Sequence, residues 1–142
     1  MKRILVALDS SPRAPEVLAA AARLARLADA RLVLFRAINV PPDVPRQLLE
    51  KSQQEIEDVL RASAHADLDR LASMVAPELV ERIATELAVP WDGIVREGRK
   101  ADADMIVIGS HGYGALDRLL GTTAAKVVNH ADRNVLIVRT PL

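Results

Sequence analysis

Short apolar runs and longer segments with helical spacing alternate along the chain. Continuous apolar stretches lie within residues 4–8, 31–39, 105–108 and 135–138, and such stretches are typical of strands buried on both faces of a parallel sheet. Residues 79–89 alternate apolar and charged positions only in part, which is typical of an edge strand. The pattern therefore predicts five strands.

Four helices are predicted between these strands. In the first, apolar residues recur at helical spacing from Val17 to Ala28, and either Pro12 or Pro15 can occupy its first turn. A long amphipathic helix is predicted over residues 46–75 and ends before Pro77. A short helix begins at Pro90, and the last covers residues 124–131. Residues 40–45 are rich in proline and predict a loop at the edge of the sheet.

Strands that alternate with helices predict an α/β fold, a parallel sheet with helices on both faces. The length of 142 residues suits one domain, residues 1–142. Lys plus Arg and Asp plus Glu both number 19, so no global field favours nucleic acid or an acidic membrane. The chain has no cysteine, which excludes disulfides and thiolate chemistry. We expect a cytoplasmic protein, because no apolar run fits a signal peptide or a membrane span.

The segment from 105 to 128 carries the candidate chemistry. Its apolar run breaks at Gly109, and further glycines follow at 112, 114 and 121. Thr122 or Thr123 can then cap a helix that begins at Ala124. Glycines let the backbone approach a ligand closely, and a helix start offers unpaired N–H groups to a phosphate. An ordinary glycine turn with an N-cap explains the same pattern about equally well.

Two common phosphate motifs do not fit. A Walker loop requires Gly-Lys-Ser/Thr, whereas Gly121 is followed by Thr-Thr-Ala-Ala-Lys. A dinucleotide fingerprint requires a third glycine beyond Ala115 and belongs after the first strand. The segment is therefore a candidate phosphate site of another type.

Three separated motifs resemble the universal stress protein family: residues 2–11, Gly109-Ser-His-Gly112 followed by Gly121-Thr122, and residues 134–139. The resemblance covers essentially the whole chain. It implies an open five-stranded parallel sheet of order 3-2-1-4-5, Rossmann-like and similar to adenine nucleotide alpha hydrolases. In the nucleotide-binding branch of the family, the pattern is glycine, two residues, glycine, nine residues and then Gly-Ser/Thr. This chain has eight residues between Gly112 and Gly121 in place of nine, and Thr122 follows Gly121.

The resemblance implies binding of ATP or a related adenine nucleotide where the first and fourth strands end, since the winding of the sheet reverses there. The implied contacts are Ala7, Asp9, Ser10, Val40, Gly109, His111, Gly112, Gly121, Thr122 and Thr123. Asp9 would meet a ribose hydroxyl or a phosphate-bound Mg²⁺ or Mn²⁺. Alternatively, Asp9 caps the first helix in competition with Ser10 and Ser11. Both roles are compatible.

We expect binding to serve stress-response regulation or sensing, because no Walker lysine, arginine finger or general base is placed for phosphoryl transfer. No catalytic residue is assigned. At most, slow ATP hydrolysis or autophosphorylation is expected, with Ser110, Thr122 and Thr123 as acceptors. Two alternatives remain: a dimeric signalling scaffold that binds no nucleotide, and an adenylate-forming enzyme.

The last strand predicts a homodimer. Val135, Leu136, Ile137 and Val138 form an apolar run, and the implied strand order places it at the edge of the sheet. An uncovered apolar edge promotes aggregation, and the same strand of a second molecule can cover it. Members of the family associate in this way.

Overall fold

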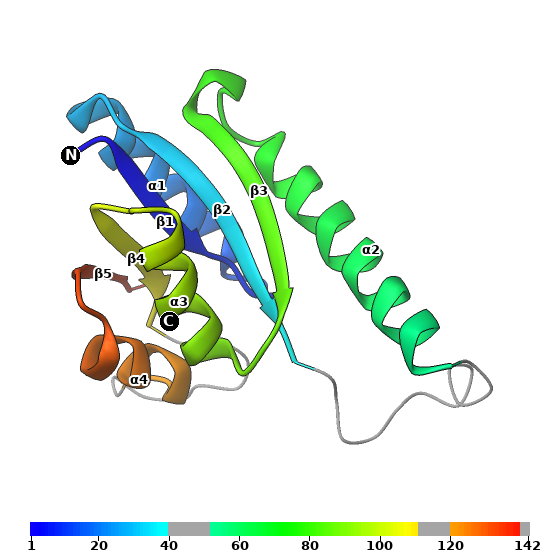
Figure 1. Ribbon diagram of the computed structural model, residues 1–142. Coiled ribbons are helices and arrows are strands. Elements are labelled where there is room, and N and C mark those ends of the chain that lie inside the picture. Colours follow the sequence, from blue (N-terminus) through cyan, green and yellow to red (C-terminus); the bar gives the residue numbers. More distant parts are fainter. Residues whose placement is uncertain (40–51, 111–119, 140–142) are drawn as a thin grey trace.

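The computed structural model describes residues 1–39, 52–110 and 120–139. Its centre is a five-stranded sheet of order β3-β2-β1-β4-β5, in which every pairing is parallel (Figure 1). The strands are β1 (Arg3–Ala7), β2 (Arg31–Ile38), β3 (Val80–Leu87), β4 (Met105–Gly109) and β5 (Asn134–Val138). The predicted fold class and strand order are confirmed, and β3 lies at one edge as expected.

Helices cover both faces of this sheet (Figure 1). They are α1 (Ala14–Ala28), α2 (Gln53–Ala72), α3 (Pro90–Lys100) and α4 (Thr122–His130), and a 3₁₀ turn, η2 (Pro77–Leu79), precedes β3. Among the described residues, no helix has the length and apolar character that a membrane span requires.

Alternate residues of the central strands build two aliphatic core layers. On one face, Ile4 and Val6 of β1 pack with α1 and with Leu68 of α2. On the other face, Leu5 of β1 and Phe35 of β2 pack with α3 and α4. Burial on both faces explains why β1 and β2 read as continuous apolar runs.

Three helix boundaries differ from the prediction by two residues or more. The long helix begins at Gln53 and not at 46, because Ser52 is extended and its hydroxyl accepts a hydrogen bond from the Glu55 amide. It also ends at Ala72, three residues before the predicted end. The last helix begins at Thr122, two residues earlier than predicted. The predicted loop at 40–45 lies outside the described residues.

Helix α3 contains two glycines, Gly93 and Gly98, and continues through both. A Cβ atom on Gly98 would lie 3.1 Å from Cδ1 of Ile106 on β4. A Cβ atom on Gly93 would lie 3.0 Å from Cβ of Ala88 and 3.3 Å from Cβ of Ala37. The glycines therefore let α3 approach the sheet closely, which places Pro90 and Ile94 beside the ends of the strands.

Candidate functional site

A pocket of about 430 Å³ lies beyond the carboxyl ends of β1 and β4, where the winding of the sheet reverses. Ligand pockets in proteins commonly measure about 300 to 1,000 Å³, so its size suits a small molecule. Most of its wall is apolar, and the polar groups lie where the strands end. The lining residues include Ala7, Asp9, Phe35, Arg36, Ala37, Pro90, Ile94, Gly109, Ser110, Gly121, Thr122 and Thr123.

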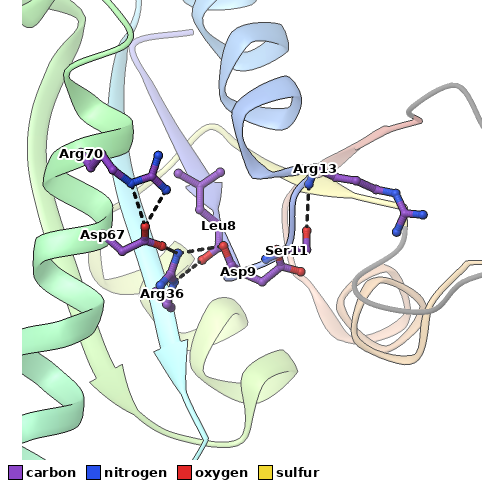
Figure 2. A network of polar contacts seen from close by, with 7 residues as sticks. All are labelled: Leu8, Asp9, Ser11, Arg13, Arg36, Asp67 and Arg70. Carbon is purple, nitrogen blue, oxygen red and sulfur yellow. Dashed lines mark hydrogen bonds and ion pairs between the residues drawn. The ribbon is translucent and has the colours of Figure 1, made fainter.

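The turn that follows β1 is built by its own side chains. Oδ1 of Asp9 accepts a hydrogen bond from the Ser11 amide at 2.9 Å, and Oγ of Ser11 accepts one from the Arg13 amide at 3.3 Å (Figure 2). Helix α1 starts at Ala14 without a side-chain cap. Asp9 therefore orders the turn, and the alternative that Asp9, Ser10 or Ser11 caps α1 is wrong. Pro15, and not Pro12, lies in the first turn of α1.

Arg36 of β2 also binds this turn, through its side chain. Its Nε donates to the Leu8 carbonyl at 2.9 Å, and its Nη2 donates to the Asp9 carbonyl at 2.8 Å. The same Nη2 lies 2.7 Å from Oδ2 of Asp67 on α2, and Arg70 donates to Oδ1 of Asp67 (Figure 2). The end of β1 is thereby connected to a helix far from it in sequence.

The two ends of the glycine-rich segment meet at the pocket. Gly109 ends β4, the Ser110 amide donates to the Val138 carbonyl at 2.9 Å, and the Gly121 amide donates to the Ser110 carbonyl at 2.7 Å. The hydrogen bond between Gly121 and Ser110 therefore joins the two ends of the glycine-rich segment.

The N-terminal end of helix α4 lies at the pocket. Gly121 is its N-cap residue and no side chain caps it, while Thr122, Thr123 and Ala124 line the pocket. The first N–H groups of a helix have no partner within the helix, and the N-terminal end of the helix dipole is positive. The prediction that a threonine hydroxyl caps this helix is wrong, because both threonines already belong to its first turn.

The pocket gathers six of the ten predicted contacts, namely Ala7, Asp9, Gly109, Gly121, Thr122 and Thr123. Ser10 is exposed and is absent from the lining, so the structure does not bring it to the pocket. Val40, His111 and Gly112 lie outside the described residues. The described residues contain no group of three or more His, Cys, Asp or Glu side chains that could hold a metal ion.

The apolar wall was missed from the sequence. This wall is formed by Phe35 and Ala37 of β2 and by Pro90 and Ile94 of α3. Alternation along β2 places residues 35 and 37 on one face, so this pair could have been found once the strand order was assumed. The contribution of Pro90 and Ile94 depends on the close packing of α3.

Comparison with known proteins identifies the family. The model of the universal stress protein family matches residues 1–139. The chain belongs to the universal stress protein family. Universal stress protein MJ0531 of Methanocaldococcus jannaschii is 32% identical over 99% of this chain and 83% of that protein.

Solved structures of similar fold agree with this assignment. The hypothetical protein MJ0577 superposes with a TM-score of 0.82 over 99% of this chain and 97% of its own, and at 22% identity it supports the fold alone. The universal stress protein from Archaeoglobus fulgidus in complex with dAMP has a TM-score of 0.67 and 26% identity, over 96% of this chain and 97% of its own. One relative of this fold thus binds an adenine nucleotide.

Proposed function

We propose that this universal stress protein binds ATP or a related adenine nucleotide in the pocket beyond β1 and β4. The observation that carries the proposal is the meeting, in one pocket of about 430 Å³, of Asp9, the two ends of the glycine-rich segment and the uncapped start of α4. The dAMP complex of the Archaeoglobus fulgidus relative supports the choice of an adenine nucleotide.

Each part of the ligand has a matching part of the pocket. The apolar wall of Phe35, Ala37, Pro90 and Ile94 suits the base. The first-turn amides and hydroxyls of Thr122 and Thr123 suit phosphate oxygens. Asp9 suits a ribose hydroxyl or a Mg²⁺ or Mn²⁺ ion carried by the phosphates. Val40, His111 and Gly112 lie outside the described residues and remain contacts predicted from the family resemblance.

Binding would serve regulation or sensing in a stress response. Within the described lining, the charged side chains are Asp9 and Arg36, and the Nε and Nη2 groups of Arg36 already bind protein oxygens. Phosphoryl transfer usually recruits cationic groups around the transferred phosphate. The arrangement therefore supports nucleotide binding in preference to rapid turnover.

The test begins with the ligand that the purified protein carries. Denatured protein is analysed for adenine nucleotides by mass spectrometry, and the apo protein is then titrated with ATP and Mg²⁺. Trp91 is the only tryptophan and follows Pro90 of the pocket wall, so its fluorescence provides a direct readout. We expect saturable binding.

Gly121→Val and Asp9→Asn are the test variants. Gly121 has φ −62° and ψ 161°, which valine also adopts, so the variant should fold while its side chain crowds the helix start. We expect each variant to weaken binding at least about tenfold, or roughly 1.4 kcal/mol. Asp29→Asn is the matched control, because Asp29 is an exposed carboxylate with φ 54°, a conformation that asparagine tolerates.

The alternatives give different outcomes. A folded wild-type protein that binds no nucleotide would favour a signalling scaffold. Rapid release of phosphate or formation of an adenylate would favour an enzyme.

The pairing of β5 with the same strand of a second molecule remains part of the proposal. β5 lies at the end of the sheet, and Leu136 is 38% exposed. An antiparallel pairing of two β5 strands about a two-fold axis would cover this edge.

A further inference from the structure

We propose that Arg36 is a positioning residue that fixes Asp9 at the pocket and makes nucleotide affinity depend on helix α2. Arg36 donates hydrogen bonds to the carbonyls of Leu8 and Asp9, and its guanidinium is itself held by Asp67 of α2. This inference rests on the proposed function, because it assigns a role to the network beside that pocket (Figure 2).

The Arg36 side chain continues the hydrogen bonding of β1 beyond the last residue pair of β1 and β2. The last register pair of β1 and β2 is Ala7 with Phe35, and the Leu8 amide still donates to the Phe35 carbonyl. Beyond that point, the carbonyls of Leu8 and Asp9 accept hydrogen bonds from the Arg36 guanidinium. Hydrogen bonds from a charged donor are stronger than those between neutral groups, so Arg36 extends the ordered part of β1 by two residues.

Asp67 fixes the guanidinium in turn. The Arg36 side chain is only 11% exposed, and a buried cation requires a paired anion. Asp67 supplies it from α2, and Arg70 binds the other oxygen of the same carboxylate. These hydrogen bonds, from Arg70 first and then Arg36, lower the pKa of Asp67, so it stays ionised at neutral pH.

Asp9 is consequently held from two directions. Arg36 binds its carbonyl, and the Ser11 amide binds Oδ1 of its side chain. A carboxylate fixed in this way is ordered before the ligand arrives, which reduces the entropy lost on binding. Arg36 lines the pocket, and its Nε and Nη2 groups bind protein oxygens, so the proposed effect of these two groups on the ligand passes through Asp9.

Arg36→Met removes the guanidinium and keeps the apolar stem. We expect ATP and Mg²⁺ to bind about tenfold more weakly, because hydrogen bonds to charged groups are lost on the turn that carries Asp9. Arg70→Met is the matched control: Arg70 belongs to the same network, but its side chain is 60% exposed and donates its hydrogen bonds to Asp67. We expect less than about a twofold change in that variant. Equal losses in both variants would overturn the proposal.

A double-variant cycle separates positioning from general stability. If Arg36 acts through Asp9, Arg36→Met weakens binding less than about twofold further when Asp9 is already alanine. A full tenfold additional loss in the Asp9→Ala background would contradict the proposal. Thermal unfolding of each variant checks that the protein is folded at the temperature of the titration.

Hydrogen exchange of the apo protein gives a readout that needs no ligand. The Ser11 amide bonds to Asp9, so its exchange should accelerate at least about tenfold in Arg36→Met and stay unchanged in Arg70→Met. Asp67→Asn keeps the shape of the anchor without its charge, and we expect about threefold faster exchange. If the wild type binds no nucleotide, the proposed function fails, and exchange alone decides the role of Arg36. An unchanged Ser11 amide in Arg36→Met would then overturn it.

Discussion

At the scale of single residues, Thr122 and Thr123 offer a ligand two kinds of donor. Both belong to the first turn of α4 and line the pocket, and no side chain caps this helix. Their amides belong to the first turn of the helix, where N–H groups lack partners within the helix. Their hydroxyls are not needed as caps, which leaves them available to phosphate oxygens.

The first prediction separates the contribution of the threonine hydroxyls to nucleotide binding from that of the backbone amides. Replacing both threonines by valine, Thr122→Val with Thr123→Val, keeps the shape of the side chains and removes both hydroxyls. We expect ATP and Mg²⁺ to bind about tenfold more weakly by titration calorimetry, because two hydrogen bonds to a charged ligand are lost.

The control for this prediction is the double variant Thr122→Ser with Thr123→Ser, which keeps the hydroxyls and should bind within about twofold of the wild type. Unchanged affinity in the valine variant would show that backbone amides alone hold the ligand.

The sequence predicts some pocket residues and misses others for a physical reason. Gly109 was predicted from a local signal, a glycine directly after an apolar run, whereas Asp9 was predicted only through the family resemblance and the strand order that it implies. The role of Arg36 depends on contacts with β1 and α2, residues that lie 27 and 31 positions away. The pattern of neighbouring residues contains no information about contacts between positions so far apart in sequence. From the sequence alone, a charged residue such as Arg36 therefore cannot be distinguished from an ordinary surface residue.

At the scale of elements, the start of α2 shows what a closer reading of the sequence could have recovered. Ser52 and Glu55 have the spacing of a capping box, with serine at the N-cap and glutamate three residues later. The prediction placed the start at 46, directly after the prolines. The cap fixes the start at Gln53, and it is a local signal that was available.

The second prediction tests this cap. Ser52→Ala removes the hydroxyl that accepts a hydrogen bond from the Glu55 amide at 3.2 Å. We expect the free energy of unfolding to fall by about 1 kcal/mol, measured by urea denaturation. Ser63→Ala is the matched control, because Ser63 is exposed in the interior of the same helix. Alanine is favoured there, so that variant should be neutral or slightly more stable.

At the scale of the whole molecule, the number of strands and the parallel sheet follow from the alternation of apolar runs and helical segments. The order β3-β2-β1-β4-β5 does not, since alternation fits several windings. It was implied by the family resemblance and is confirmed. The pocket follows from that order, because β1 and β4 become neighbours although their ends lie about a hundred residues apart in sequence.

At the other end of the sheet, three carboxylates accept hydrogen bonds from arginine side chains or backbone amides. The Asp104 carboxylate accepts the amides of Lys2 and Arg3, and these bonds lower its pKa. Hydrogen bonding from Arg3 lowers the pKa of Glu81, and Arg133 lowers the pKa of Asp132 to about 2. All three carboxylates are therefore more acidic in the folded than in the unfolded protein.

The third prediction follows from the sign of these shifts. Depressed pKa values contribute stability above the unfolded values, and this contribution is lost as the pH falls through the folded values. We expect stability to urea to be constant down to about pH 5 and then to fall steadily towards about pH 2. Asp104→Asn should flatten this decline. A wild-type profile that rises on acidification would contradict the prediction.

The proposed dimer depends on which backbone groups of β5 face outwards. The Val138 carbonyl accepts the Ser110 amide, so the backbone groups of Val138 point inwards, towards the end of β4. The N–H and C=O of one residue point to the same side of a strand, and those of the next point to the other side. Ile137 therefore presents its N–H and C=O outwards, where a second β5 strand can bind them.

The fourth prediction places a charge at this edge. We expect the wild type to have about twice its chain mass of 15.4 kDa in light scattering after size exclusion. Leu136→Lys should shift it to the monomer, because two related β5 strands would bring like charges and desolvated ammonium groups together. Met74→Lys is the control: Met74 is 54% exposed beyond the end of α2, away from β5, and its lysine variant should stay dimeric. A monomeric wild type would contradict pairing through β5 while leaving the nucleotide proposal intact, because the described pocket is lined by residues of one chain.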